Sequence, residues 1–363
     1  MPSEPRPEQR RSWLRRARVS YTLATNLRPG RILGARYEVL APLGRGGMGT
    51  VFRARDRVSG RPVAVKVLGP EWAERRDMRE RFRTEMQLAQ KVRHRNVCRI
   101  LDCGEDGRRL YLVTELVEGI DLKRLLARSG GLPAEHAFEG AIQIARGLQA
   151  VHDAGIVHRD VKSPNVIVDR SGRFRLLDFD LAERVEDAAR GAGGQVHGTP
   201  EYMSPEQARG DGVAFASDVY SLGVVVFELF TGDLPFKGDT AAATVRKQVE
   251  DAPPLTGPKA ARLPPPLLPI LRKSLDKDPT RRYPRARSLV EALRLARSTV
   301  GLADATPATD ASHEGFSALL GALNPRDATV RLEPRPTRAF ALRQSREAMA
   351  RLVAALTREP DAG

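Results

Sequence analysis

Residues 158–165 read His-Arg-Asp-Val-Lys-Ser-Pro-Asn, and residues 178–180 read Asp-Phe-Asp after a short predicted strand. The functional side chains that these two blocks hold at fixed separations are Asp160, Lys162, Asn165 and Asp178. A carboxylate can receive the proton of a substrate hydroxyl, Asn and Asp oxygens are ligands that Mg²⁺ accepts, and a lysine supplies a cation near a transferred phosphoryl group. The stretch is therefore typical of metal-assisted phosphoryl transfer to a hydroxyl.

A glycine-rich turn lies upstream, where residues 44–51 read Gly-Arg-Gly-Gly-Met-Gly-Thr-Val between two predicted strands. Glycines let backbone amides approach phosphate oxygens, because no side chain stands in the way. Alone, this spacing also fits an ordinary hairpin, and a dinucleotide fold is disfavoured because a strand rather than a helix follows. Lys66 stands in the next apolar strand, and Glu85 on a predicted helix is placed to pair with it, which would fix a cation for phosphate binding.

The predicted elements change in kind along the chain. Short β-rich runs separated by glycine-containing turns predict an antiparallel sheet over residues 37–40, 50–55, 62–68 and 110–115. Apolar residues at helical spacing predict helices over residues 79–92, 134–154, 218–231, 266–275 and 286–297. A small antiparallel β lobe with one helix, followed by a larger helical lobe, is a bilobal α+β fold.

The sequence predicts four parts. They are a basic flexible arm (1–36), a folded domain (37–297, with its small lobe at 37–118 and its large lobe at 119–297), a linker (298–338) and a C-terminal amphipathic helix with a tail (339–363). The arm carries nine arginines against two glutamates, within a chain of net charge +15. Such charge suits an acidic partner, but a solvated extension is the simpler and favoured explanation. Sparse aromatic residues in the arm make nucleic acid an unfavoured partner.

Cysteine content and hydropathy indicate the compartment. The chain has two cysteines, Cys98 and Cys103, too few for a disulfide framework or a four-cysteine zinc site. Its longest apolar run, over residues 222–230, is far shorter than the ~20 residues that cross a bilayer. Residues 1–18 lack the apolar core of a secretory signal. We therefore expect a soluble, cytoplasmic protein without a transmembrane segment.

Taken together, these motifs give residues 37–297 a resemblance to eukaryotic-type (Hanks-type) Ser/Thr protein kinase domains of the group found in bacteria. The resemblance implies ATP and Mg²⁺ as cofactors, with Mn²⁺ as a substitute, and proteins as substrates. It implies catalytic roles for Asp160, Lys162, Lys66 and Glu85, and metal binding by Asn165 and Asp178. The nucleotide contacts that it implies are Leu43, Gly44, Gly46, Gly49, Val51, Ala64, Lys66, Thr114, Glu115, Val117, Asp121 and Ile167.

Further matches to the family bear on the fold and on the acceptor. Ser204-Pro-Glu206 stands where the family has Ala-Pro-Glu, and the resemblance implies that Glu206 pairs with Arg282 and that Asp218 braces the catalytic-loop backbone. Lys162, two residues after the catalytic aspartate, and Thr199, which the family pattern places between Asp160 and Lys162, are the Ser/Thr-kinase choice. Tyrosine is therefore not the expected acceptor.

The chain departs from the family at Asp180, where the family has the glycine of Asp-Phe-Gly. An aspartate restricts the backbone and adds a negative charge close to the metal site. One reading is a catalytically silent pseudokinase that binds nucleotide and acts as a scaffold. The other, which the intact chemical residues favour, is an active enzyme in which Asp180 stiffens the segment. A small-molecule kinase of the same fold is disfavoured by the peptide-binding segment 199–206.

The activation segment is also unusual, since residues 181–197 contain no Ser, Thr or Tyr. Arg159 is of the kind that receives an activation-loop phosphate. We therefore predict that activation does not depend on phosphorylation between Asp178 and Thr199. Either Glu186 or Asp187 serves Arg159 as a built-in anion, or the segment is loose and is ordered by a partner or substrate.

Overall fold

The computed structural model describes residues 27–45, 49–69, 76–179, 182–189 and 198–302, except for the side chains of residues 76–78, 81, 85 and 183. Within this part, the chain forms two compact units. The first comprises residues 27–86 and 100–116, and the second comprises residues 87–99 and 117–302.

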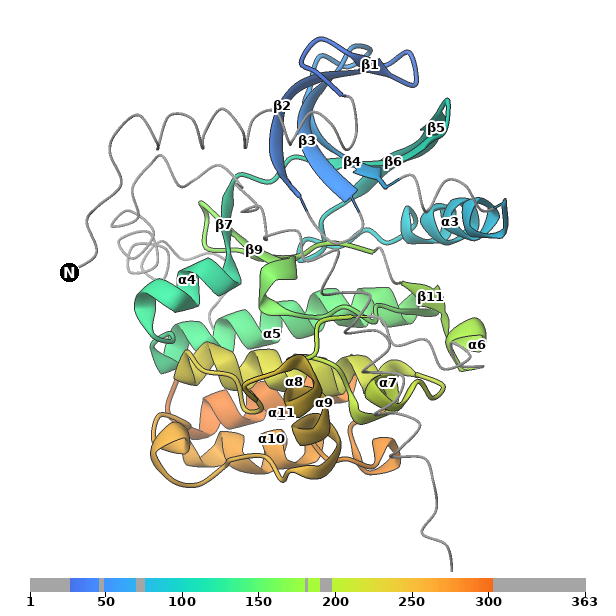
Figure 1. The fold of residues 1–363 in the computed structure, drawn as a ribbon. Helices are drawn as coiled ribbons and strands as arrows, with labels where there is room; N and C mark the ends of the chain where they lie inside the picture. Colours follow the sequence, from blue (N-terminus) through green and yellow to red (C-terminus); the bar gives the residue numbers. More distant parts are fainter. Residues whose placement is uncertain (1–26, 46–48, 70–75, 180–181, 190–197, 303–363) are drawn as a thin grey trace, which may run out of the picture. The chain divides into compact units, whose positions relative to one another are not determined.

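The first unit is an antiparallel sheet of six strands with one helix, α3 (Arg76–Ala89) (Figure 1). In spatial order the strands are β1 (Ile32–Leu33), β2 (Tyr37–Arg45), β3 (Gly49–Asp56), β4 (Pro62–Leu68), β6 (Arg109–Glu115) and β5 (Ile100–Asp106). Alternate residues of the central strands are buried, as a sheet with one packed face requires. The core residues on that face include Val39, Phe52, Ala54, Val63, Val65 and Val113.

The sheet also includes residues that precede Tyr37, the predicted start of the folded domain. Leu27 and Leu33 are buried in the core of the sheet, and β1 pairs with the start of β2. Arg36 fixes the turn between β1 and β2 by donating two hydrogen bonds of 2.8 Å each to the Asp56 carboxylate. The same carboxylate also accepts hydrogen bonds from the Ser59 hydroxyl and the Val58 amide. Residues 27–36 are thus part of the folded unit, and the rest of the predicted arm, residues 1–26, lies outside the described residues.

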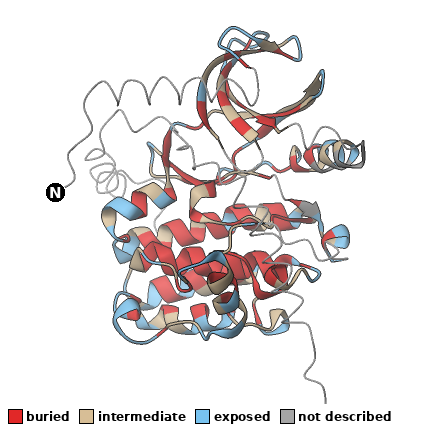
Figure 2. Ribbon diagram, viewed as in Figure 1, coloured by how far each residue is buried: buried red, intermediate tan, exposed pale blue. Residues whose placement is uncertain are grey.

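The second unit is mainly helical, and its core forms around two long helices (Figure 2). They are α5 (Ala134–Asp153) and α8 (Phe215–Thr231), and residues 215–230 of α8 are all buried. A helix that is apolar on every side must be enclosed by other elements. The other helices are α4 (Leu122–Ser129), α6 (Val185–Ala188), α7 (Pro205–Arg209), α9 (Ala241–Glu250), α10 (Leu268–Ser274) and α11 (Ala286–Thr299).

Two small antiparallel sheets complete the second unit. One has the order β10 (Phe174–Leu176), β9 (Val166–Asp169) and β7 (Gly119–Asp121), and the other pairs β11 (Glu183–Arg184) with β8 (Ile156–Val157). Strand β8 leads directly into the block at 158–165 and β9 leads out of it, so both ends of that block are fixed by sheet hydrogen bonds.

The predicted α+β fold is confirmed, and the five predicted helices lie within a few residues of α3, α5, α8, α10 and α11. In the parts of the chain that the structure describes, no helix has the length and apolar composition needed to cross a membrane. The predicted C-terminal helix at 339–358 lies outside the described residues.

Candidate active site

The side chains of the 158–165 block converge on Asp160. Lys162 Nζ donates to both carboxylate oxygens of Asp160, at 2.7 and 2.6 Å, and to Thr199 Oγ at 3.0 Å. Asn165 Nδ2 donates to the Asp160 carboxylate at 2.8 Å and to its backbone carbonyl at 3.0 Å. The structure thus brings together Asp160, Lys162, Asn165 and Thr199, as predicted, although the Thr199 hydroxyl is hydrogen-bonded to the lysine.

The backbone of this block is strained and is held from two sides. Arg159 has a φ of 64°, a left-handed conformation that non-glycine residues rarely adopt. Asp218 of α8 accepts hydrogen bonds of 2.8 Å from the amides of His158 and Arg159, and Gln207 Nε2 donates to the Arg159 carbonyl at 2.9 Å. The predicted bracing by Asp218 is confirmed, and Gln207 is a second brace that the sequence analysis did not find.

Asp218 is itself held by a buried histidine. His152 Nε2 lies 2.9 Å from Oδ2 of Asp218, the oxygen that also accepts from the His158 amide, and the Ala286 amide at the start of α11 donates to His152 Nδ1 at 3.3 Å. Because Nδ1 accepts this hydrogen bond, Nε2 carries the proton. Three helices thereby fix one carboxylate, which in turn fixes the strained loop.

Asp178 follows β10 in the same unit. The Leu177 amide donates to the Asn165 carbonyl at 2.8 Å, which brings the two predicted metal ligands close along the backbone. Phe179 is buried with its ring 5.2 Å from that of His158, and Asp178 has a φ of 66°. Both hydrogen bonds that Asn165 makes to Asp160 use its amide nitrogen. The side-chain oxygen of Asn165 and the carboxylate of Asp178 are hard oxygen donors of the kind that Mg²⁺ prefers, so these residues fit the ion.

In the first unit, four predicted site residues share one face of the sheet. Val51 is paired with Lys66, and Ala64 with Thr114, on the face opposite the packed core. Side chains on one face of neighbouring strands are close, so the register groups these four as predicted. Gly49 has a structural reason to be glycine, because a Cβ there would lie 2.1 Å from the Val67 carbonyl oxygen.

In the second unit, Val117 and Ile167, two of the expected nucleotide contacts, pack together with Cys98 in a small apolar cluster. Asp121 has a different visible role. Its carboxylate caps α4 by accepting the Arg124 amide at 2.9 Å, and burial raises its pKa despite that hydrogen bond. Helix α4 was not predicted, so this capping role was missed.

Three expectations fall outside what the structure describes. They concern Gly46 in the glycine-rich turn, the side chain of Glu85 and the variant residue Asp180. Glu115 ends β6, as predicted, whereas Leu43 and Gly44 lie in β2, which extends to Arg45 and past the predicted strand at 37–40.

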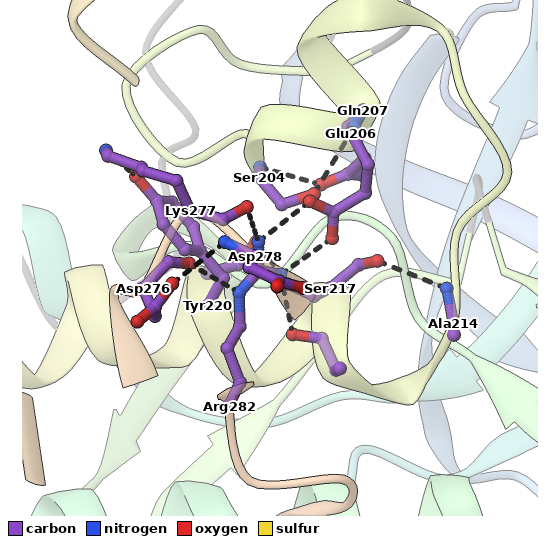
Figure 3. Close-up of polar contacts among 12 residues, drawn as sticks. Ser204, Glu206, Gln207, Ala214, Ser217, Tyr220, Asp276, Lys277, Asp278 and Arg282 are labelled. Carbon is purple, nitrogen blue, oxygen red and sulfur yellow. Dashed lines mark hydrogen bonds and ion pairs between the residues drawn. The ribbon is translucent and has the colours of Figure 1, made fainter. Parts of the chain in front are cut away.

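The segment after Thr199 is anchored by the predicted ion pair (Figure 3). Arg282 donates to both oxygens of Glu206, at 2.7 and 2.9 Å, and also to the carbonyls of Ala216, Asp276 and Lys277. Burial opposes the charge of Glu206, but the hydrogen bonds and charge of Arg282 outweigh it, and the pKa of Glu206 is lowered. A bidentate pair with every guanidinium nitrogen used is a rigid anchor for residues 204–209.

The role of another buried carboxyl, that of Glu228, was not predicted. Ser163 Oγ, Tyr202 Oη and the Glu228 carboxyl form a triangle, with contacts of 2.8, 3.0 and 2.8 Å. Burial is the largest cause that raises the pKa of Glu228, to about 6. The triangle joins the 158–165 block to the 199–206 segment inside the helical core.

Similarity to known proteins agrees with this geometry. Residues 37–292 match the protein kinase domain family, which is most of the chain. The chain belongs to the protein kinase family. The serine/threonine-protein kinase PknA of Mycobacterium tuberculosis is 40% identical over 261 residues, which cover 70% of this chain and 60% of PknA. The kinase pkn2 of Myxococcus xanthus is 42% identical over 278 residues, 74% of this chain and 33% of pkn2.

A solved structure of a protein kinase is also similar. The crystal structure of the Mycobacterium tuberculosis PknI kinase domain superposes with a TM-score of 0.59 and 26% identity, over 74% of this chain and 99% of that domain. The similarity to PknA and pkn2 spans less than two thirds of their length. The family membership rests on the match over residues 37–292.

Proposed function

We propose that the protein is a Ser/Thr protein kinase that transfers the γ-phosphoryl group of ATP to hydroxyls of other proteins. The observation that supports this most strongly is the convergence of Lys162 and Asn165 on Asp160, with Thr199 bound to the same lysine. Asp160 is the only carboxylate in this cluster of four side chains, so it is assigned the task of orienting the acceptor hydroxyl and receiving its proton. Lys162 holds negative charge on the transferred phosphoryl group.

Asn165 and Asp178 are the residues proposed to hold Mg²⁺, or Mn²⁺ in its place. When bound, the ion neutralises phosphate charge and orients the nucleotide. The left-handed backbone at Asp178, with a φ of 66°, supports this role, because strained conformations cluster at ligand-binding and active sites. The proposed nucleotide contacts are Leu43, Gly44, Gly46, Gly49, Val51, Ala64, Lys66, Thr114, Glu115, Val117, Asp121 and Ile167, with Glu85 as the partner of Lys66.

We further propose that activation needs no phosphate between Asp178 and Thr199. Helix α6, at the start of this segment, is anchored by other means. Ala188 is buried in an apolar cluster with Val157, Val213 and Phe215, and its carbonyl accepts the Val213 amide at 3.0 Å. Strand β11 pairs with β8, and the Val185 amide donates to the Gly155 carbonyl at 3.0 Å. These contacts order residues 182–189 without an added charge, and Glu186 or Asp187 is the proposed anion for Arg159.

We also propose that the substrates are proteins, that the basic N-terminal residues bind an acidic partner, and that the protein is cytoplasmic. The acceptor is a Ser or Thr because of Lys162 and Thr199, which are hydrogen-bonded to each other at 3.0 Å.

The test is incubation of the purified chain with Mg²⁺ and γ-labelled ATP, alone and with a generic basic acceptor protein. Label on Ser or Thr is expected, with a rate loss of about a thousandfold or more in Asp160→Asn, since a general base contributes about 10²–10⁴-fold. A matched control is Asp169→Asn, in the same unit but on the β9–β10 turn, which should retain activity.

The activation proposal has its own arm in this experiment. Protein that has been treated with a phosphatase and then separated from it should transfer phosphate without a lag. A long lag that ends as label accumulates on Thr199, the one Ser, Thr or Tyr in residues 178–199, would overturn that proposal. Measurable ATP binding with no transfer to any protein would favour the pseudokinase scaffold, the alternative that Asp180 raises.

A further inference from the structure

A line of buried polar side chains leads from the 276–282 turn to the backbone of residues 200–201. Lys277 Nζ lies 3.0 Å from Tyr220 Oη and donates to the Gln248 carbonyl at 2.7 Å. Tyr220 Oη donates to Gln248 Oε1 at 2.7 Å. Gln248 Nε2 donates to the carbonyls of Glu201 at 2.6 Å and Pro200 at 3.2 Å. Tyr220 and Gln248 are fully buried, so water does not compete for these contacts.

The donor and acceptor types at both ends give every hydrogen bond in this line the same direction. An ammonium group can only donate, so the Tyr220 oxygen accepts from Lys277. The carbonyls of Pro200 and Glu201 can only accept, so the amide nitrogen of Gln248 faces them and its side-chain oxygen accepts the phenol proton. The cation on one turn and the two carbonyls on another segment therefore favour the same orientation of Gln248.

Lys277 is held among aromatic rings and charges of both signs. Its ammonium lies 4.0 Å from the centre of the Phe236 ring and 5.3 Å from that of Tyr220. The guanidinium of Arg282 stacks on the same Tyr220 ring at 4.8 Å (Figure 3). Burial, followed by the charge of Arg282, lowers the pKa of Lys277 to about 7. The acidic groups that oppose this shift are Asp251 and Asp276.

The two carbonyls that receive Gln248 belong to a turn beside the proposed catalytic residues. Thr199, directly before Pro200, accepts from Lys162 at 3.0 Å, and the Tyr202 amide donates to the Thr199 carbonyl at 3.0 Å. A change in the position of Pro200 or Glu201 must therefore move Thr199 or Tyr202. In the proposed function, this turn belongs to the segment that receives the acceptor polypeptide.

We propose that Lys277, Tyr220 and Gln248 form a positioning relay that sets the affinity of the 199–204 turn for the acceptor polypeptide. The proposal rests on the proposed protein kinase function. None of the three residues belongs to the proposed nucleotide or metal site, so the relay should act on acceptor binding and leave ATP binding unchanged.

The sharpest test is Tyr220→Phe, which removes one hydroxyl and keeps the ring that stacks on Arg282. We expect the KM for a basic acceptor protein to rise about fivefold to tenfold, as expected for losing one to two buried hydrogen bonds, with the KM for ATP unchanged. The matched control is Thr244→Val on the same helix as Gln248. Thr244 is also buried and hydrogen-bonded, to Gly238 and Thr240, but does not contact residues 200–201. An equal rise in acceptor KM in both variants, or a rise in ATP KM, would overturn the relay.

The pH dependence gives a second readout. Lys277 carries its charge below about pH 7 and loses it above. A neutral amine has a lone pair and can accept the phenol proton, which would then be lost from the hydrogen bond to Gln248. The KM of the wild type for the acceptor protein should therefore rise between pH 6 and pH 8.5. Lys277→Met should remove this part of the pH dependence. Parallel profiles for the wild type and the Lys277→Met variant would refute the assignment.

Hydrogen exchange separates the failure of the relay from the failure of the proposed function. The amides of residues 199–204 should exchange about fivefold to tenfold faster in Tyr220→Phe than in Thr244→Val, without any acceptor or ATP. This result does not need an active enzyme. If the wild type transfers no phosphate, faster exchange in Tyr220→Phe still supports the positioning role, and equal exchange in the two variants rejects it.

Discussion

Replacing Glu228 by glutamine should stabilise the protein above pH 6 and have a much smaller effect near pH 5. The reason is the number of protons in the triangle formed by Ser163, Tyr202 and Glu228. Three oxygen–oxygen contacts of 2.8 to 3.0 Å need three protons, and the two hydroxyls supply two. The third is supplied by the carboxyl when it is protonated. When it ionises, one contact becomes a repulsion between lone pairs in a buried place.

The magnitude follows from the shift in the pKa of Glu228. Burial, partly offset by the hydrogen bonds from Tyr202 and Ser163, raises the pKa from 4.5 to about 6 in the folded protein. A raised pKa means that the folded state binds the proton more tightly than the unfolded state. Its contribution to stability is complete below pH 4.5 and is lost as the pH rises through 6. The full loss is about 2 kcal/mol, of which about 1 kcal/mol lies between pH 5 and pH 8.

The assay is urea unfolding of the wild type and of Glu228→Gln at pH 5, 6, 7 and 8. Glutamine supplies donors at every pH, so the stability of the variant relative to the wild type should grow by about 1 kcal/mol from pH 5 to pH 8. Glu206→Gln is the contrasting control, because the pKa of Glu206 is lowered by its pairing with Arg282. That variant should be less stable than the wild type by a nearly constant amount from pH 5 to pH 8, because the contribution of a lowered pKa is almost complete above the ordinary value of 4.5. A constant difference between the wild type and Glu228→Gln across the four pH values would refute the proton count.

Three further predictions concern the anchor, the helix cap and the activation segment. Arg282→Lys keeps the charge but loses the fork that binds a buried glutamate and three carbonyls, and should lower the free energy of unfolding by about 2–4 kcal/mol in urea titrations. Asp121→Ser preserves a helix cap, so stability should change by less than about 0.5 kcal/mol; a raised KM for ATP would then assign Asp121 to the nucleotide, and an unchanged KM to capping alone. Gly212→Ala places a Cβ 2.2 Å from the Ala189 carbonyl, and should speed proteolytic cleavage within residues 182–189 and reduce phosphate transfer.

The predicted parts of the fold are those in which a pattern repeats over several residues. The alternation of Val63, Val65 and Val67 identifies a strand, and a long, mostly apolar helix such as α8 can be recognised from its own residues. Strand β1 was missed because two residues are too few to alternate. Strand β1 is stabilised by the burial of Leu27 and Leu33 in the core of the sheet, and a local sequence pattern does not indicate such a long-range contact. Helix α4 was missed because Asp121 was interpreted only as a ligand, whereas its position before Leu122 is also that of a helix cap.

The residues of the candidate site were predictable for a different reason, since Asp160, Lys162 and Asn165 are close in sequence and meet within one turn. The residues that hold this turn in place are distant in sequence. Gln207 reaches it from 48 residues away and Asp218 from 59 or 60. Asp218 was found because it belongs to a motif, while Gln207 belongs to none that the sequence analysis used. Motifs therefore identify groups that do chemistry, and leave out many groups that orient them.

Ser163 is a residue whose structural role its motif does not indicate, and this role affects how the stability of the protein depends on pH. In the sequence it looks like a spacer between Lys162 and Asn165, yet its hydroxyl is one corner of the buried triangle. Its two partners lie 39 and 65 residues further along the chain. A residue without a hydroxyl at this position would leave Glu228 with Tyr202 as its remaining partner in the triangle. The hydrogen bond from Ser163 is one of those that offset burial, so without it the pKa of Glu228 should rise further. The pH dependence expected for Glu228 should therefore be larger in Ser163→Ala than in the wild type.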